Sequence, residues 1–212
     1  MNRLTLLAAP AALAAALVLG CQDSGGAGGA GHDAEHGAAH PTTAATRSAG
    51  GTDQAGTKVA VANIRPSQAA STQPSWGTPT GKITFTQTGG RVKITGDLTG
   101  LPPGRHGIHI HEKGDMSAPD LMSTGGHYNP DKHPHGGPTT SPVHAGDFGN
   151  LTADESGKAS IDLTVTDITL GGEKNDVLGK PVIIHEKADD LKSQPSGNSG
   201  ARIAGGLIEM QK

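Results

Sequence analysis

Histidines are concentrated in one part of this sequence, and their spacing is regular enough to bind metal. Eight of the eleven histidines occur between residues 106 and 185. His109 and His111 alternate with isoleucine, which is the period-two pattern of a β-strand. Side chains two apart on a strand leave the same face, so these two imidazoles can converge on one ion.

A second group of candidate ligands lies in irregular sequence. His127, His135, His144 and Asp147 follow one another through a stretch rich in glycine and proline, which excludes a regular element. A loop this long inside a compact domain needs something to hold it. Three imidazoles and a carboxylate suit a closed, tetrahedral zinc site, whereas the all-imidazole first group, open on one side, suits copper better.

Two simpler interpretations compete with defined metal sites. A single histidine is usually solvated or is a hydrogen-bonded part of a core, and a histidine-rich loop can chelate metals without selectivity. The ordered spacing on both the strand and the loop favours defined sites.

Several motifs together resemble one known family. The segments HGIHIHEKGD, GGHYNP, HGGP, HAGDFGNL, IIHEKADDL and GNSGARIAGGLI occur in this order, and all of them resemble copper,zinc superoxide dismutases. The resemblance covers about residues 58 to 212 and rests on several motifs rather than on one. It implies copper and zinc as cofactors and superoxide as the substrate.

The resemblance also implies a ligand set for each metal. Copper is expected at four histidines: His109, His111, His127 and His185. Zinc is expected at three histidines and one aspartate: His127, His135, His144 and Asp147. His127 is in both sets because the family's bridging histidine touches both metals as an imidazolate, and it is also expected to carry a proton in catalysis.

Four further residues take expected roles from the same resemblance. Asp189 matches a carboxylate that hydrogen-bonds one copper and one zinc histidine, here His109 and His135, and fixes their tautomers. Arg202 matches the cationic residue beside copper; the alternative is a plain surface arginine. His106 matches a structural histidine outside the ligand set, and His133 matches nothing and is expected to be solvated.

Short stretches with strand patterning recur from residue 58 onward. Alternation is clear at 58–64, 82–86 and 91–98, and Gly89-Gly90 is typical of a hairpin turn. Further strands are expected at 106–112, 158–165, 181–185 and 202–209, and no stretch shows sustained helical periodicity. We therefore predict one all-β domain over residues 57–212. It is expected to be a Greek-key, immunoglobulin-like β-sandwich or barrel with long metal-binding loops, an architecture that copper,zinc superoxide dismutases are known to share.

The N-terminal sequence predicts targeting to a membrane. Residues 1–20 combine a basic start with an apolar run that ends Val18-Leu19-Gly20-Cys21, which resembles the lipobox of bacterial lipoproteins. Cleavage there would leave Cys21 as a lipidated N-terminus, held at a membrane by its acyl anchor. The alternative is an ordinary signal peptide cut nearby.

Residues 21–56 have the composition of a flexible tether. Glycine, alanine, serine and threonine dominate, and almost no large apolar residue is present to offset chain entropy. His32, His36 and His40 recur every four residues within this segment. Capture of metal by these three histidines and a solvated linker are both open interpretations.

Composition excludes nucleic acid as an expected partner and excludes an internal disulfide. Residues 57–212 contain 15 basic and 16 acidic residues, a formal net charge of −1, and no basic patch interleaved with aromatics. Cys21 is the only cysteine in the chain, so no intramolecular disulfide can form. Relative to the family pattern, Met116 and Gly205 occupy the positions of a cysteine pair.

The predicted function is superoxide dismutase activity in a bacterial cell envelope, on the periplasmic side of a membrane. Copper redox cycling would convert superoxide to dioxygen and hydrogen peroxide. One alternative is a lipoprotein that buffers copper and zinc with the same ligands but without turnover. Another is an inactive relative, which would be expected to have lost ligands. Formation of a homodimer stays open, because subunit contacts vary in this family.

Overall fold

A computed structural model describes residues 56–212, and this part of the chain is built from β-strands. The signal segment, Cys21 and the three histidines of the tether lie outside the described residues. The strands are β1 (Lys58–Pro66), β2 (Thr80–Thr88), β3 (Arg91–Thr99), β4 (Gly104–Ile110), β5 (Asp147–Ala153), β6 (Ala159–Val165), β7 (Pro181–His185) and β8 (Arg202–Met210).

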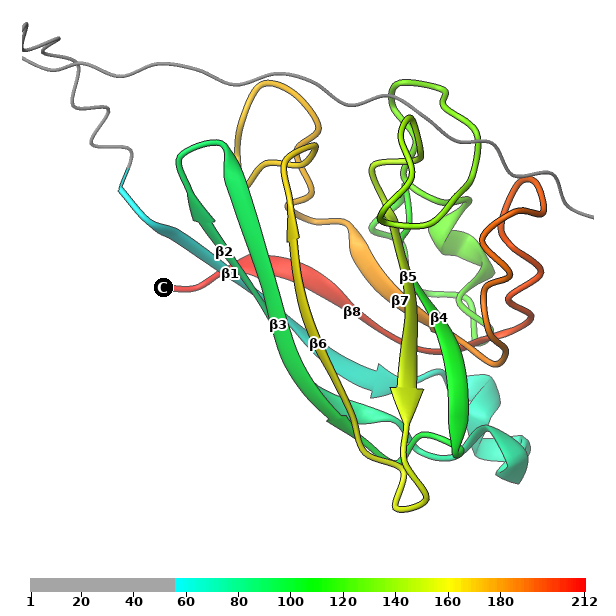
Figure 1. The fold of residues 1–212 in the computed structure, drawn as a ribbon. Coiled ribbons are helices and arrows are strands. Elements are labelled where there is room, and N and C mark those ends of the chain that lie inside the picture. Colours follow the sequence, from blue (N-terminus) through cyan, green and yellow to red (C-terminus); the bar gives the residue numbers. More distant parts are fainter. Residues whose placement is uncertain (1–55) are drawn as a thin grey trace, which may run out of the picture. The chain divides into compact units, whose positions relative to one another are not determined.

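The eight strands form an antiparallel sheet that nearly closes into a barrel (Figure 1), with the order β5-β4-β7-β8-β1-β2-β3-β6. The end strands β5 and β6 are consecutive and joined by a tight turn, in which Asp154 N donates to Lys158 O at 2.9 Å. The neighbouring pairs β4–β7, β8–β1 and β3–β6 are distant in sequence, as in Greek-key folds. The predicted all-β Greek-key barrel is confirmed.

One strand and three short turns were not predicted from the sequence. Strand β5 contains Gly149 at a φ of 76° and pairs with β4 through a register shift between Gly107 and His109, so its residues do not alternate cleanly. Three 3₁₀ turns also occur: η1 (Gln68–Thr72), η2 (Pro74–Trp76) and η3 (Met122–Thr124). Within residues 56–212, no helix is long and apolar enough to cross a membrane.

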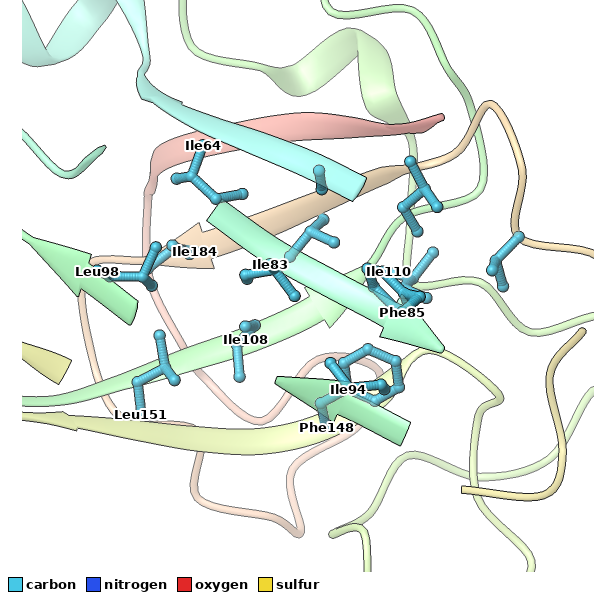
Figure 2. Packing of buried hydrophobic residues seen from close by; sticks show 14 of the residues in the cluster. Ile64, Ile83, Phe85, Ile94, Leu98, Ile108, Ile110, Phe148, Leu151 and Ile184 are labelled. Atoms are coloured by element: carbon cyan, nitrogen blue, oxygen red, sulfur yellow. The ribbon is translucent and has the colours of Figure 1, made fainter. Parts of the chain in front are cut away.

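Alternate residues of the strands fill the interior of the barrel. Ile83 and Phe85 of β2 are fully buried and pack with Ile94 of β3 (Figure 2). Ile108 and Ile110 of β4 reach the same core from another side of the barrel. Few aromatic residues take part, so branched aliphatic side chains make up most of the core, as the composition predicts.

The opposite faces of β4 and β7 are also buried, which is unusual for an antiparallel sheet. Their inward positions, such as Ile108 and Ile184, belong to the core. Their outward positions include His109 and His185, which are covered by the loops that follow β4 and β7. In Figure 1 these loops, in green and orange, lie beside β4 and β5. Because side chains alternate along a strand, His109 and His185 point away from the core and lie beneath these loops.

Candidate metal centre

The predicted copper ligands are brought together on the outer face of β4 and β7. His109 lies on β4, His111 directly follows it, and His185 ends β7. His127 comes from the loop after β4 and forms an isolated antiparallel bridge with His111. All four are buried, and their ligand atoms lie within 4.8 Å of one another.

Two rings of this cluster are held so that bare nitrogens face each other. His111 Nδ1 lies 3.0 Å from the carbonyl oxygen of Gly125, and His185 Nδ1 lies 3.3 Å from that of Gly200. Because a carbonyl only accepts, both rings carry their proton on Nδ1 and a lone pair on Nε2. The two Nε2 atoms are 3.3 Å apart. Two lone pairs cannot hydrogen-bond to each other, so this arrangement favours a cation between the rings.

The second cluster gathers three histidines around one carboxylate. His127 Nδ1 and His144 Nδ1 lie 2.8 and 3.2 Å from Asp147 Oδ1, and His135 Nδ1 lies 2.9 Å from Asp147 Oδ2. Bonds of about 2.0 Å to a tetrahedral zinc ion would set ligand atoms about 3.3 Å apart. The observed distances are close to that spacing, and the four side chains are buried.

Unpartnered nitrogens test whether the clusters fit metal ions. Among the described residues, the buried side-chain atoms without a hydrogen bond are His109 Nδ1, His127 Nε2 and His135 Nδ1. All three belong to the two clusters. Leaving a buried polar atom unpaired costs about 1–3 kcal/mol, and such atoms are rare in native proteins. Coordination of a cation would satisfy each lone pair, so the donor sets fit metal.

Asp189 connects the two clusters from behind. Its Oδ2 accepts from His109 Nε2 and its Oδ1 accepts from His135 Nε2, both at 2.9 Å. These bonds place the ring protons on Nε2 and leave Nδ1 bare in both rings. Asn150 holds the backbone of Asp189 with two hydrogen bonds, of 2.7 and 2.9 Å. One buried carboxylate thus fixes a ring in each cluster.

Burial and hydrogen bonding set the charges within the centre. Burial lowers the pKa of His109 and His185, and it lowers that of His127 to about 4, so these rings are neutral. Burial alone would raise the pKa of Asp147, but hydrogen bonds with the surrounding histidines hold it well below its ordinary range. Neutral imidazoles and an ionised carboxylate are the forms that bind metal. Burial would lower the pKa of His135 as well, but contacts with the carboxylates of Asp147 and Asp189 raise it to about 9, so metal binding at this ring displaces a proton.

The family of the chain follows from comparison with known proteins. A family model for copper/zinc superoxide dismutase matches residues 79–208. The chain belongs to the copper/zinc superoxide dismutase family. Membership and the two complete clusters make copper and zinc the metals of this centre.

Individual relatives agree with this placement. The chain is 43% identical over 134 residues to an extracellular [Cu-Zn] superoxide dismutase of Caenorhabditis elegans, and the alignment spans 60% of the length of each protein. It is 48% identical over 138 residues to one of Drosophila melanogaster, covering 60% of this chain and 74% of the relative. A crystal structure titled for the clock protein EA4 matches with 39% identity and a TM-score of 0.62, covering 72% of this chain and 94% of that one.

Arg202 lies at the pocket of the first cluster. This pocket of about 410 Å³ is lined by His111, His127, His185 and Arg202, with Met122 at its exposed side. Arg202 begins β8 and is partly buried, so it is not a plain surface arginine. The chain therefore has a fixed positive charge beside the first histidine cluster.

Two hydrogen bonds between Gln194 and the backbone of His135 could not be predicted from the sequence. Gln194 Oε1 accepts from His135 N at 2.8 Å, and Gln194 Nε2 donates to His135 O at 3.0 Å. A single glutamine therefore holds both backbone groups of a metal ligand. Gln194 lies in a polar loop with no periodicity. The only sequence feature that could have pointed to it as a partner of the site is its place in the short loop after Asp189.

Two histidines of the same region belong to neither cluster. His106 has Nδ1 2.9 Å from His185 O and Nε2 2.8 Å from Pro102 O, so its ring joins two backbone segments. His133 Nδ1 donates to Val143 O at 3.1 Å within the zinc loop, and its ring is only partly exposed. The expectation that His133 is solvated is therefore only half right.

Met116 and Gly205 are neighbours in the structure. A Cβ added to Gly205 would lie 3.2 Å from Met116 Cε. A methyl group therefore fills the space between the two segments that a cysteine pair would join. Because no disulfide links them, the loop after β4 depends on packing, hydrogen bonds and metal.

Replacement of Asp189 by asparagine should weaken both metal sites. Asparagine cannot accept from both rings through two carboxylate oxygens, so the tautomers of His109 and His135 are no longer fixed, and affinity should fall about 10- to 100-fold. Competition with chromogenic chelators measures this for zinc and copper separately. The control is Asp190→Asn, since the Asp190 carboxylate accepts hydrogen bonds only from its own loop, from Lys192, Ser193 and Asn198. Equal affinities for Asp189→Asn and wild type would contradict the role.

Thermal stability should depend on metal and not on thiol chemistry. Binding to a site that the unfolded chain lacks adds to the free energy of folding. We expect zinc removal to lower the melting temperature steeply and to loosen the loop between Glu112 and Asp147, while strong reductants change nothing. Calorimetry on holo, zinc-free and apo protein, with and without reductant, measures this. A metal-free form that melts within a few degrees of the holo form would show the idea to be wrong.

Proposed function

We propose that residues 57–212 form a superoxide dismutase that converts two superoxide anions and two protons into dioxygen and hydrogen peroxide. The observation that carries the proposal is the open pocket in which bare nitrogens of His111 and His185 face each other beside Arg202. Copper, when bound, supplies the one-electron redox chemistry that oxidises one superoxide and reduces the next. The other requirements of the reaction are met by the side chains of this chain.

The ligand sets divide between the metals by their chemistry. Four imidazoles at an open pocket suit copper: His109, His111, His127 and His185. Three imidazoles and a carboxylate in a closed site suit zinc: His127, His135, His144 and Asp147.

His127 is the proton carrier in this proposal. Its Nδ1 lies at Asp147 in the second cluster, while its Nε2 has no partner within the described residues and borders the pocket. Nε2 is therefore the ring nitrogen that can take up a proton and pass it to reduced substrate. The carboxylate of Asp147 keeps the ring in place while this happens.

Arg202 draws the anionic substrate into the pocket and orients it. Attraction of the substrate by a charged cleft is a known property of superoxide dismutases. The loop from residue 186 to 201 is short, and its basic residues are Lys187 and Lys192. Long-range steering should therefore be modest, and most of the effect should come from Arg202 itself.

The enzyme is proposed to be a bacterial lipoprotein of the cell envelope, with residues 1–20 as signal peptide and 21–56 as tether. The Val18-Leu19-Gly20-Cys21 boundary supports a lipidated Cys21. The extracellular dismutases among the relatives support a place outside the cytoplasm. The absence of other cysteines is compatible with this location.

A homodimer formed by the described part of this chain would have few exposed apolar residues to bury at its interface. Within residues 56–212, the large hydrophobic side chains that are strongly exposed are Met122 and Met210. Met122 belongs to the catalytic pocket. A stable dimer would therefore need a largely polar interface, and sedimentation of the full chain measures whether one forms.

Superoxide consumption by the metal-loaded full chain tests the activity. The wild-type protein should consume superoxide catalytically, whereas a metal-buffering protein would bind both metals without consuming superoxide. Arg202→Glu should lower the rate about tenfold or more at low salt, because it reverses the charge at the pocket. Both metals should stay bound, since no ligand changes. The control is Arg91→Glu, which makes the same change of net charge at an exposed position of β3. Equal rates for wild type and Arg202→Glu would refute the role of this arginine.

Fractionation of bacterial cells tests the anchor. Cys21→Ser removes the only thiol that can be acylated, so activity should move from the membrane fraction to the soluble fraction. Wild type should also incorporate labelled fatty acid, and the variant should not. Activity of Cys21→Ser that remains with membranes would exclude a lipid anchor at this residue.

A further inference from the structure

The guanidinium group of Arg202 is held by one nitrogen. Nη1 donates to Leu121 O and to the hydroxyl oxygen of Thr124, each at 2.8 Å. These two bonds use both protons of Nη1. No other hydrogen bond of the Arg202 side chain occurs among residues 56–212, so Nε and Nη2 stay available for an anion in the pocket.

The proton of the Thr124 hydroxyl has a defined place. Thr124 Oγ1 donates to Leu121 O at 2.8 Å and accepts from Arg202 Nη1. It also lies 3.3 Å from His111 Nδ1, whose proton goes mainly to Gly125 O. The Thr124 hydroxyl therefore contacts both Arg202 and His111, a histidine of the first cluster. In each contact one group can donate and the other can accept.

The backbone around Thr124 makes this contact rigid. Thr124 is fully buried and ends the short η3 turn. Its amide donates to Leu121 O at 3.1 Å, and its carbonyl accepts from Lys113 N at 3.0 Å. Leu121, which provides the other acceptor for Arg202, has a left-handed backbone with φ of 61°. A buried hydroxyl on a turn fixed at both ends is a stiff support for a long, flexible side chain.

We propose that Thr124 is a positioning residue for catalysis, which holds the Arg202 guanidinium in the orientation that receives the anionic substrate. This inference rests on the proposed function. Thr124 itself does not touch the substrate in this view, because its hydroxyl is occupied by Leu121, Arg202 and His111. It acts by limiting the rotamers of Arg202, and so by limiting the entropy lost when an anion binds.

Two substitutions separate the hydroxyl from the shape of the side chain. Thr124→Val keeps the branched shape and removes the acceptor, and Thr124→Ser keeps the hydroxyl. Because Leu121 O still holds Arg202, we expect Thr124→Val to lower kcat/KM and the affinity for azide, an anion probe, by about fivefold each. Thr124→Ser should restore most of both. Azide binding is followed by visible absorption of the copper-loaded protein, and metal content is measured for every variant. Thr124→Ala replaces the valine variant if that protein does not fold.

A double-mutant cycle with Arg202→Ala decides whether Thr124 acts through the arginine. If it does, Thr124→Val should have no further effect once Arg202 is alanine. A full-sized effect in that background, or wild-type azide affinity in metal-replete Thr124→Val, would overturn the proposal. Thr72→Val is the matched control, because Thr72 Oγ1 in the η1 turn makes the same bond to a carbonyl three residues earlier but does not bond to Arg202. If the wild-type protein does not consume superoxide, only the proposed function is refuted. The double-mutant cycle read out by azide affinity still tests whether Thr124 positions Arg202.

Discussion

Bare imidazole nitrogens converge at two points under the loops of the barrel, and most of the local structure depends on that convergence. His111 Nε2 and His185 Nε2 face each other at 3.3 Å, and His135 Nδ1 faces a carboxylate oxygen at 2.9 Å. Without a cation the contact between His111 and His185 opposes folding, because two lone pairs are brought together away from water. With a cation they become ligand bonds. The same atoms therefore penalise the apo fold and stabilise the metal-bound one, which couples the order of the loops to the metals.

The sequence predicted the parts of the site that follow a local rule. The alternation of His109 and His111 with isoleucine predicted that both rings leave one face of a strand; His109 lies on β4, His111 directly follows it, and both rings reach the same cluster. Strand β5 obeyed no such rule, because Gly149 and the register shift against β4 hide its alternation. Gln194 and Thr124 were missed for a different reason. Each acts on a residue more than 50 positions away, and no spacing within a loop reports such a partner.

Polar contacts replace the covalent link between the loop after β4 and the last strand. Met116 fills the space beside Gly205 with a flexible apolar side chain, which packs but cannot restrain the unfolded chain. In the folded chain, hydrogen bonds join this loop to β8 instead: Arg202 Nη1 donates to Leu121 O and to Thr124 Oγ1. These bonds exist only in the folded state. They therefore add specificity to the native loop geometry, and they leave the metal ions as the main cross-link between segments.

The shape of the pocket beside Arg202 depends on the same metal cross-link. The loop from His111 to His127 has a copper-cluster ligand at each end, and between them it carries Leu121 and Thr124, the two acceptors for Arg202. A cation that draws the two histidines together thus also sets the position of these acceptors. Arg202 gains its fixed orientation only when that loop is in place. The position of the Arg202 charge and the positions of His111 and His127 are therefore coupled, because the same loop determines them.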